Sequence, residues 1–232
     1  MTYVISNLHG HLEEFTKLLD TIHFSDKKDI MYILGDIVDI GPDAIALVND
    51  LSYRTNVYCI AGEHDFMAAK MLAGYNKMME GAKSGQSPDP DFVQAMTEWI
   101  TDGGRTTMEA YRELDADGQE GVLDYLSDMP FYEEISVGGK DYLLLHCGIY
   151  DFCENLDLDE LEPEDFFSEA IDATAHYFDD KTIIAGHTVT TEDNGGEGRI
   201  FYGNGTILID CGLGRGGRLG CLRLEDGAEF YV

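Results

Sequence analysis

The sequence predicts an α/β fold, because short apolar runs of strand length alternate with segments of helical period. Five runs are rich in β-branched and aromatic residues and indicate buried strands: 3–6, 30–34, 57–61, 142–145 and 182–185. Two amphipathic helices separate the early strands. Their apolar faces consist of Leu12, Phe15, Leu18, Leu19 and Ile22, and of Ile45, Val48 and Leu51.

The length and composition favour one globular domain. The chain has 232 residues, of which 44% are hydrophobic and 26% are charged. We expect a single domain over 1–232 with a helical insertion at about 74–128. Within this insertion the pattern predicts a loop at 81–90 and helices near 92–100, 106–114 and 119–126.

The remaining chain returns to strands. The run at 131–137, the Gly138-Gly139 turn and the strand at 142–145 predict a hairpin. The acidic segment 154–165 suits a loop that leads into a helix, and it lacks the spacing of a calcium-binding loop. Further strands are expected at 200–202, 206–210, 220–224 and 229–232.

The charge balance excludes two classes of partner. Lys and Arg number 15 against 45 Asp and Glu, which gives a formal net charge of −30. Such a chain repels phosphate backbones and anionic lipid headgroups, so we expect neither nucleic acid nor membrane as a partner. A phosphate-containing substrate would need local positive charge, which bound metal ions can supply.

Cysteine usage and the N-terminus predict a cytoplasmic protein. The five cysteines form no Cys-x-x-Cys pair and most lie in apolar runs, so we expect reduced and buried thiols. The first residues show no basic region followed by an apolar stretch, and no apolar run approaches the length of a membrane span.

Metal-ligand and acid-base residues follow each of the five predicted strands. The clusters are Asn7-Leu8-His9, Gly35-Asp36-Ile37-Val38-Asp39, Gly62-Glu63-His64-Asp65, His146-Cys147-Gly148 and Gly186-His187-Thr188. The carboxyl ends of strands in an open α/β sheet converge on one crevice. A lone histidine after an apolar run is more often a core or surface residue, but five clusters in register favour a shared site. Imidazole, carboxylate and amide together suit first-row divalent metals rather than calcium.

This ordered set resembles the signature of the calcineurin-like metallophosphoesterase superfamily, in particular its bacterial and phage-type serine/threonine protein phosphatase branch. The resemblance extends from residue 1 to about 225. It includes the element Trp99-Ile100-Thr101-Asp102-Gly103-Gly104-Arg105-Thr106-Thr107 and the strands at 207–212 and 221–224. The fold that it implies is a four-layer αββα sandwich of two mixed β-sheets flanked by helices.

The resemblance also implies roles. Asn7, His9 and Asp36 would hold a first metal ion, and Asp36, Glu63, His146 and His187 a second. The expected metal is manganese, with iron, zinc or nickel as alternatives. Two such ions can activate an attacking water and stabilise both oxygens of an in-line displacement. His64 would be the general acid, and Asp39 would orient its imidazole and stabilise its charged form.

Four positions depart from the family pattern. Asn7 replaces an Asp and Glu63 replaces an Asn, so formal charge moves from the first metal to the second without a net change. Ile40 and Ala61 replace arginines that the resemblance assigns to phosphate binding, which predicts weaker binding of phosphomonoesters. Arg215 and Arg218 are candidate replacements, against the alternative that they are solvated loop charges.

The expected function is hydrolysis of a phosphate ester, either a phosphoserine/threonine protein or a small phosphate ester. Two alternatives are a dinucleoside polyphosphate hydrolase and a catalytically weakened, phosphatase-like binding protein. A third is a fold with an empty cleft that serves protein interaction. The sequence identifies neither the substrate nor the oligomeric state.

Overall fold

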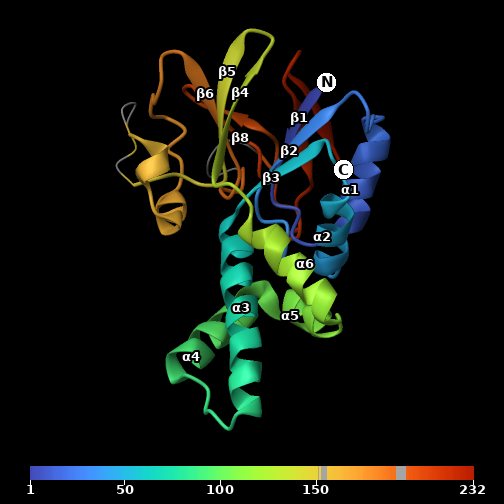
Figure 1. Ribbon diagram of the computed structural model, residues 1–232. Coiled ribbons are helices and arrows are strands. Elements are labelled where there is room, and N and C mark those ends of the chain that lie inside the picture. The colour runs from blue at the N-terminus through green and yellow to red at the C-terminus, as the bar shows by residue number, and fades with distance from the viewer. Residues whose placement is uncertain (151, 153–155, 192–196) are drawn as a thin grey trace.

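Two five-stranded sheets pack face to face in the computed structural model, which describes residues 1–150, 152, 156–191 and 197–232 (Figure 1). Cys153 and the first two residues of the acidic segment lie outside the described residues. The described part contains no helix long and apolar enough to cross a membrane.

The first sheet combines three parallel strands with two antiparallel ones in the order β10-β9-β1-β2-β3. Ile5 of β1 pairs with Ile33 of β2, and Leu34 of β2 pairs with Ile60 of β3. The strands are β1 (Thr2–Ile5), β2 (Ile30–Leu34), β3 (Val57–Ile60), β9 (Gly220–Arg223) and β10 (Ala228–Tyr231).

The second sheet has the order β4-β5-β6-β8-β7, with β5, β6 and β8 parallel and the two edge strands antiparallel. Its first two strands form the predicted hairpin. The strands are β4 (Tyr132–Val137), β5 (Lys140–Leu145), β6 (Lys181–Ala185), β7 (Phe201–Tyr202) and β8 (Thr206–Leu208).

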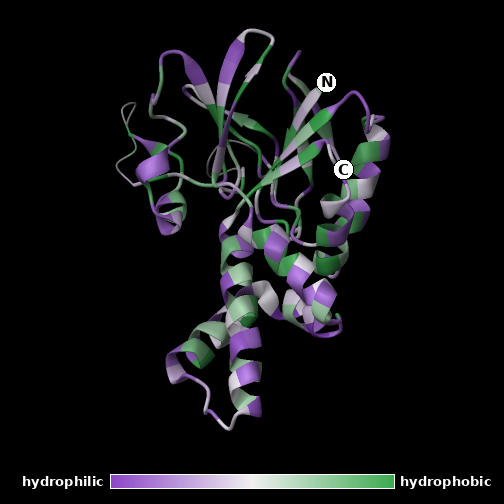
Figure 2. Cartoon of the chain, viewed as in Figure 1, coloured by the Kyte–Doolittle hydropathy of each residue, from purple (hydrophilic) through white to green (hydrophobic). Residues whose placement is uncertain are grey.

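Alternation of side chains along the central strands creates three apolar layers. Val4 lies between the sheets together with Leu144, whereas Ile5 faces the helices on the other side of the first sheet. Leu143 and Leu145 face the outer side of the second sheet. Figure 2 shows hydrophobic residues both on the central strands and on parts of the helices, and many hydrophilic residues at the far end of α3 (Glu63–Lys83).

Helices cover both outer faces, which confirms the four-layer arrangement. On the first sheet lie α1 (Leu12–Thr21) and α2 (Ala44–Ser52), whose buried residues join the strands in one apolar cluster. The outer face of the second sheet packs against the segment of the short 3-10 helices η2 (Leu158–Glu160) and η3 (Pro163–Phe167).

The predicted insertion region consists of five helical elements below the sheets (Figure 1). They are α3 (Glu63–Lys83), α4 (Pro90–Trp99), η1 (Ile100–Gly104), α5 (Arg105–Arg112) and α6 (Ala116–Ser127). The loop predicted at 81–90 was partly wrong, because α3 continues to Lys83. Gly74 and Gly81 weaken a helix only modestly and do not end it.

Candidate active site

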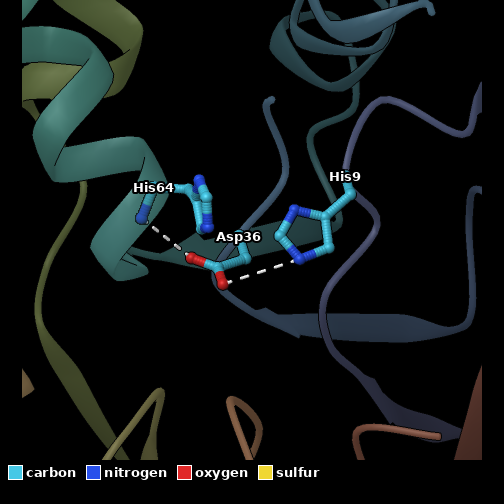
Figure 3. A group of neighbouring side chains, drawn as sticks. All are labelled: His9, Asp36 and His64. Atoms are coloured by element: carbon cyan, nitrogen blue, oxygen red, sulfur yellow. Dashed lines mark hydrogen bonds and ion pairs between the residues drawn. The ribbon is translucent and has the colours of Figure 1, made fainter. Parts of the chain in front are cut away.

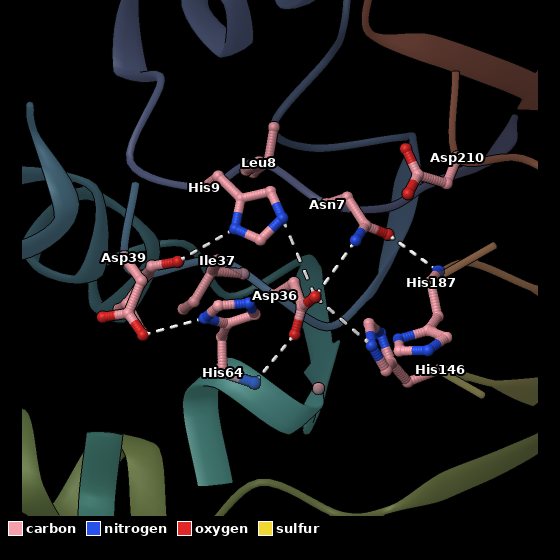
Figure 4. A network of polar contacts seen from close by, with 12 residues as sticks. Asn7, Leu8, His9, Asp36, Ile37, Asp39, His64, His146, His187 and Asp210 are labelled. Carbon is pink, nitrogen blue, oxygen red and sulfur yellow. Dashed lines mark hydrogen bonds and ion pairs between the residues drawn. The ribbon is translucent and has the colours of Figure 1, made fainter. Parts of the chain in front are cut away.

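Six parallel strands end at the same side of the molecule, and each delivers polar residues there. Asn7 and His9 follow β1, Asp36 and Asp39 follow β2, and Glu63 and His64 begin α3 directly after β3. The second sheet contributes His146 after β5, His187 after β6 and Asp210 after β8. The sticks in Figure 4 converge from both sheets, as strand-end placement predicts.

Asp36 stands at the centre of this cluster and is 2% exposed. Its Oδ2 lies 3.4 Å from Nε2 of His146 and 3.7 Å from Nε2 of His9, while Oδ1 accepts from the backbone N–H of His64 at 3.0 Å (Figure 3). Burial would raise the pKa of Asp36, but the charges of His146 and His9 outweigh it and hold this pKa well below its usual range.

Two groups of possible ligand atoms share the Asp36 carboxylate. One comprises His9, Asp36 and His64, and the other Asp36, His146 and His187; within each group the atoms lie within 4.8 Å of one another. A carboxylate shared by two donor groups fits a pair of metal ions that lie close together.

The histidine orientations fit metal binding. The Nδ1 atoms of His9 and His146 lie 3.2 Å and 2.7 Å from the carbonyl oxygens of Val38 and Leu34, so each ring directs Nε2 towards Asp36. A backbone carbonyl on the far nitrogen is typical of metal-ligating imidazoles. Nε2 of His146 is buried and makes no hydrogen bond within the described residues. Such an orphaned atom facing a carboxylate fits a metal ligand.

The backbone around the cluster is strained. Asn7, His9, Asp36, Asp39 and His187 all have positive φ angles, of 52°, 43°, 54°, 68° and 59°. Left-handed backbone is uncommon for residues other than glycine and concentrates at functional sites. Gly62 permits the close approach of two loops, because a Cβ there would lie 2.2 Å from the backbone nitrogen of Asp36.

His64 and Asp39, which the sequence predicts as a general acid and its orienting partner, lie in direct contact. Nδ1 of His64 lies 2.9 Å from Oδ2 of Asp39, whose side chain is fully buried. Burial lowers the pKa of His64, but the hydrogen bond to Asp39 and the charges of Asp36 and Asp39 outweigh it and raise this pKa to about 9. The imidazole is therefore protonated at neutral pH.

The insertion region supplies two more partners for Asp39. Nε1 of Trp99 donates to Oδ2 at 2.8 Å, and Oγ1 of Thr107 donates to Oδ1 at 2.6 Å. The carboxylate thus has donors on both oxygens although it is shielded from water. From the sequence alone we assigned no role to Trp99 or Thr107. We used the element from Trp99 to Thr107 as evidence for the family, but that element does not reveal the contact with Asp39.

Asp65 ties the strand-end loops together. Its Oδ1 accepts from the backbone N–H groups of Ile37 and Val38 at 2.9 Å and 3.2 Å, and Oδ2 accepts from that of Gly62 at 3.0 Å. The side chain is fully buried. One carboxylate therefore fixes the loop after β2, which carries Asp36 and Asp39, against the start of α3, which carries His64.

Comparison with known proteins decides the family. The sequence model described as calcineurin-like phosphoesterase matches residues 2–196. The chain belongs to this family. Calcineurin-like phosphoesterases normally use a pair of divalent metal ions, and the two groups of residues around Asp36 are possible ligands for such a pair.

Curated relatives include enzymes named symmetrical bis(5'-nucleosyl)-tetraphosphatase. The protein of Buchnera aphidicola subsp. Acyrthosiphon pisum (strain Tuc7) is 43% identical over 74 residues, which are 32% of this chain and 27% of the relative. The chain thus matches little more than a quarter of that relative's length. The protein of Erwinia tasmaniensis aligns over 99% of this chain and 96% of its own length, at 25% identity.

Solved structures share the fold. A crystal structure provisionally described as a diadenosine tetraphosphatase has a TM-score of 0.62 at 19% identity and covers 100% of this chain and 92% of its own. A metallophosphoesterase from Sphaerobacter thermophilus has a TM-score of 0.53 at 18% identity and covers 99% and 86%.

Asn7 stands where the family pattern has an Asp, so a neutral amide replaces an anionic ligand at this position. Its Oδ1 accepts from the backbone N–H of His187 at 3.1 Å, and its Nδ2 donates to Oδ2 of Asp36 at 3.1 Å (Figure 4). The N–H of His187 requires an acceptor, which fixes the amide orientation. The amide nitrogen therefore faces Asp36 on the side of the predicted first metal.

Glu63 begins α3, and its side chain is exposed. The two groups of mutually close ligand atoms do not include its carboxylate, although its charge acts on the pKa of His187. The predicted role of Glu63 as a ligand of the second metal stays a prediction. Burial and the charge of His146 lower the pKa of His187, which favours the neutral form that binds metal.

Arg215 and Arg218 differ in position. Burial is the main cause that lowers the pKa of His9 and of His187, and the charge of Arg215 lowers both a little further, so Arg215 lies within electrostatic reach of these candidate ligands. The guanidinium of Arg218 instead lies over the ring of Tyr231 at 5.6 Å from its centroid. Both side chains are exposed. The electrostatic effect of Arg215 on His9 and His187 favours Arg215 over Arg218 as a candidate substrate ligand.

Ile40 and Ala61, which replace arginines of the family pattern, lie in different surroundings. Ile40 packs against the loop of Arg215, because a Cβ at Gly214 would lie 3.5 Å from its Cγ2 atom. Ala61 instead lines a groove with Phe66, Lys70 and other residues, and no candidate metal ligand lines that groove.

Asp210 is a buried carboxylate that the predicted ligand set leaves out. It follows β8 and accepts from the backbone N–H of Gly212 at 2.9 Å. Burial raises its pKa to about 6, and the charge of Asp36 adds to this effect. The same strand-end rule that selected the other clusters could have found it, because the predicted strand 206–210 ends there.

Proposed function

We propose that this chain is a metal-dependent phosphohydrolase that cleaves dinucleoside polyphosphates. The observation that supports it most is the Asp36 carboxylate, which lies between His9 on one side and His146 and His187 on the other and accepts a hydrogen bond from the backbone N–H of His64. The names of the curated relatives support the substrate class. A phosphoprotein substrate has less support, since the yeast serine/threonine phosphatase among the solved structures is only 11% identical.

The types of ligand atoms indicate which residues could hold each ion of a metal pair. His9 and Asp36 would hold one ion, with Asn7 as a weak neighbour, and Asp36, His146 and His187 would hold the other, with Glu63 as a further candidate. Imidazole and carboxylate suit manganese, with iron, zinc or nickel as alternatives. When bound, such a pair supplies Lewis acidity and lowers the pKa of an attacking water.

His64 is the proton donor. Its Nδ1 is held by Asp39, so the proton on the other ring nitrogen is available to the departing oxygen. Asp39 stabilises the charged imidazole, and Trp99 and Thr107 donate hydrogen bonds to the Asp39 carboxylate and hold it in place. Arg215 contributes the positive charge that an acidic chain otherwise lacks near a polyphosphate.

Hydrolysis of diadenosine tetraphosphate by manganese-loaded protein tests this proposal. We expect nucleotide products from the wild type and a loss of turnover of at least about a hundredfold in His64→Ala. His176→Ala is a matched control, because His176 is half-exposed and pairs only with the exposed Asp179. Equal turnover in wild type and His64→Ala would contradict the proposal.

One observation favours a second candidate, a phosphatase-like binding protein with weak turnover. The Asn7 amide directs its nitrogen, not an oxygen, towards Asp36. If this feature limits catalysis, Asn7→Asp combined with Glu63→Asn should raise activity at least tenfold. No gain, together with binding of the substrate in the presence of manganese, would favour the binding role.

A further inference from the structure

A groove of about 590 Å³ runs along the edge of β3, apart from the candidate active site. In the order of the first sheet, β3 comes last and pairs with β2 alone among the described strands (Figure 1). All four residues of β3, from Val57 to Ile60, line this groove. Because successive side chains of a strand point to opposite faces, a groove that all four of them line lies at the edge of the strand. We call it the β3 groove; no candidate metal ligand lines it.

The backbone of β3 turns hydrogen-bonding groups towards this groove. The N–H of Met31 in β2 donates to the carbonyl oxygen of Asn56 at 3.0 Å. Backbone groups alternate along a strand, so those of Tyr58, two residues further on, also face β2. The N–H and carbonyl groups of Val57 and Cys59 therefore face away from β2, and no described strand pairs with them there.

The segment at 129–130 already makes one backbone contact with this edge. The N–H of Ala61, two residues beyond Cys59 and on the same side, donates to the carbonyl oxygen of Pro130 at 2.7 Å. Met129 and Pro130 line the β3 groove. The groups of Val57 and Cys59 continue the row that Ala61 begins, so an extended peptide can pair with them as an added strand.

Two stacked tyrosines and two carboxylates determine the chemistry of the β3 groove. The rings of Tyr32 and Tyr58 stack with their centroids 5.6 Å apart, and Tyr58 is 51% exposed. Burial and then the charge of Glu133 raise the pKa of Tyr32, so this carboxylate acts on the stacked pair. Asp128 lines the groove from the end of α6.

The two carboxylates are not neutralised. Among the described residues none forms an ion pair with Glu133 or Asp128, and neither Lys nor Arg lines the groove; Lys181 pairs with the neighbouring Glu134 instead. A positively charged ligand would therefore find uncompensated negative charge here. A second copy of this chain would bring its own net charge of −30, which opposes pairing of two β3 edges.

We propose that the β3 groove binds an extended, basic segment of a partner protein, which adds to the edge of β3 as a further strand. Backbone hydrogen bonds to Val57 and Cys59 hold the segment in register. An arginine of the segment stacks on the exposed ring of Tyr58 and pairs with Glu133, because a planar guanidinium suits both an aromatic face and a carboxylate.

A labelled hexapeptide of alternating valine and arginine is a suitable probe, with binding measured by fluorescence anisotropy at about 0.15 M salt. The control peptide has the same sequence with every backbone nitrogen methylated, so its charge is unchanged but it cannot donate to a strand. We expect the control to bind at least about tenfold more weakly. Equal binding of the two peptides would show that only the net charge of the protein attracts them, and would overturn the proposal.

Variants of the protein locate the binding site. Glu133→Gln should weaken binding of the hexapeptide at least about threefold. Glu134→Gln removes the same charge from the next residue of β4, which does not line the groove, and should leave binding unchanged. Tyr58→Ala should also weaken binding, whereas Tyr53→Ala, at a residue that is 87% exposed and lies outside the groove, should not. Equal effects within either pair of variants would contradict the proposed site.

Amide hydrogen exchange of the wild type tests strand addition without any substitution. The peptide should slow exchange of the Val57 and Cys59 N–H groups at least about tenfold. Unchanged exchange at both residues would overturn the proposal. Slow exchange that appears without peptide and grows with protein concentration would identify a second copy of this chain as the occupant, and would overturn it equally. None of these measurements involves metal or hydrolysis, so their outcome is independent of the proposed function.

Discussion

Trp99 donates a 2.8 Å hydrogen bond from its indole Nε1 to Oδ2 of Asp39, the same oxygen that lies 2.9 Å from Nδ1 of His64. A residue of the insertion region is thereby coupled to His64, the proposed proton donor. Trp99 does not touch the candidate ligand atoms around Asp36, so we regard it as a positioning residue that acts through Asp39.

Trp99→Phe tests this coupling. The variant keeps most of the buried ring but removes one of the donors to a buried carboxylate, which costs about 1–3 kcal/mol of unfolding free energy. Because the Asp39 carboxylate then has one donor fewer and accepts more strongly from His64, the pKa of His64 should rise, and the alkaline limb of kcat should move to higher pH. A change in stability with an unaltered pH profile would show that Trp99 is structural only.

Stability of the metal-free protein should depend on pH through His64. Its pKa is raised from 6.5 to about 9, so its contribution is fully present below about pH 6.5 and is lost as pH rises through about 9. The loss amounts to at most about 3 kcal/mol. His146 shifts in the same direction, so His64→Gln is needed to isolate the share of His64.

Urea unfolding with a chelator, at about pH 6 and about pH 10, measures this effect. The wild type should lose more unfolding free energy between the two conditions than His64→Gln does. Equal losses in the two proteins would show that the Asp39 pair does not raise the pKa of His64.

Asn7→Asp should strengthen metal binding at the first position. An Asp can keep one oxygen on the N–H of His187 and present the other to the cation, where the amide now presents a nitrogen to Asp36. We expect affinity for manganese to rise by about tenfold or more at one of two sites, by calorimetric titration. Asn49→Asp, an exposed change on α2, provides the control for added negative charge.

Arg215→Ala and Arg218→Ala should behave differently. Arg215 acts electrostatically on His9 and His187, whereas Arg218 lies over Tyr231. Loss of a charge-assisted contact to phosphate should raise KM for the dinucleoside polyphosphate by about tenfold or more in Arg215→Ala, and by less than about twofold in Arg218→Ala. Similar KM values for both variants would argue against a phosphate contact by Arg215.

The alternation of strand-like and helix-like apolar patterns predicted most of the fold, because strands and helices each have a characteristic sequence period. Val4 and Ile5 face different layers as alternation requires. The end of α3 was missed, because Gly81 lowers helix propensity without abolishing the helix. The face-to-face packing of the two sheets followed from the family resemblance and not from any local pattern.

Strand-end placement predicted which residues gather around Asp36, but not how they contact one another. The orientation of the Asn7 amide depends on the N–H of His187, which is 180 residues away in the sequence. The contact of Trp99 with Asp39 likewise depends on how α4 packs against α3. Tertiary packing determines such partners, and the local sequence pattern does not predict them.

We propose that two metal ions share the Asp36 carboxylate. Anomalous diffraction from crystals grown with manganese can locate both ions. We predict two anomalous peaks about 3.5–4 Å apart on either side of the Asp36 carboxylate, one beside His9 and the other beside His146 and His187. Saturating manganese that left no peak near Asp36, or a peak only at a site without Asp36, would contradict the account.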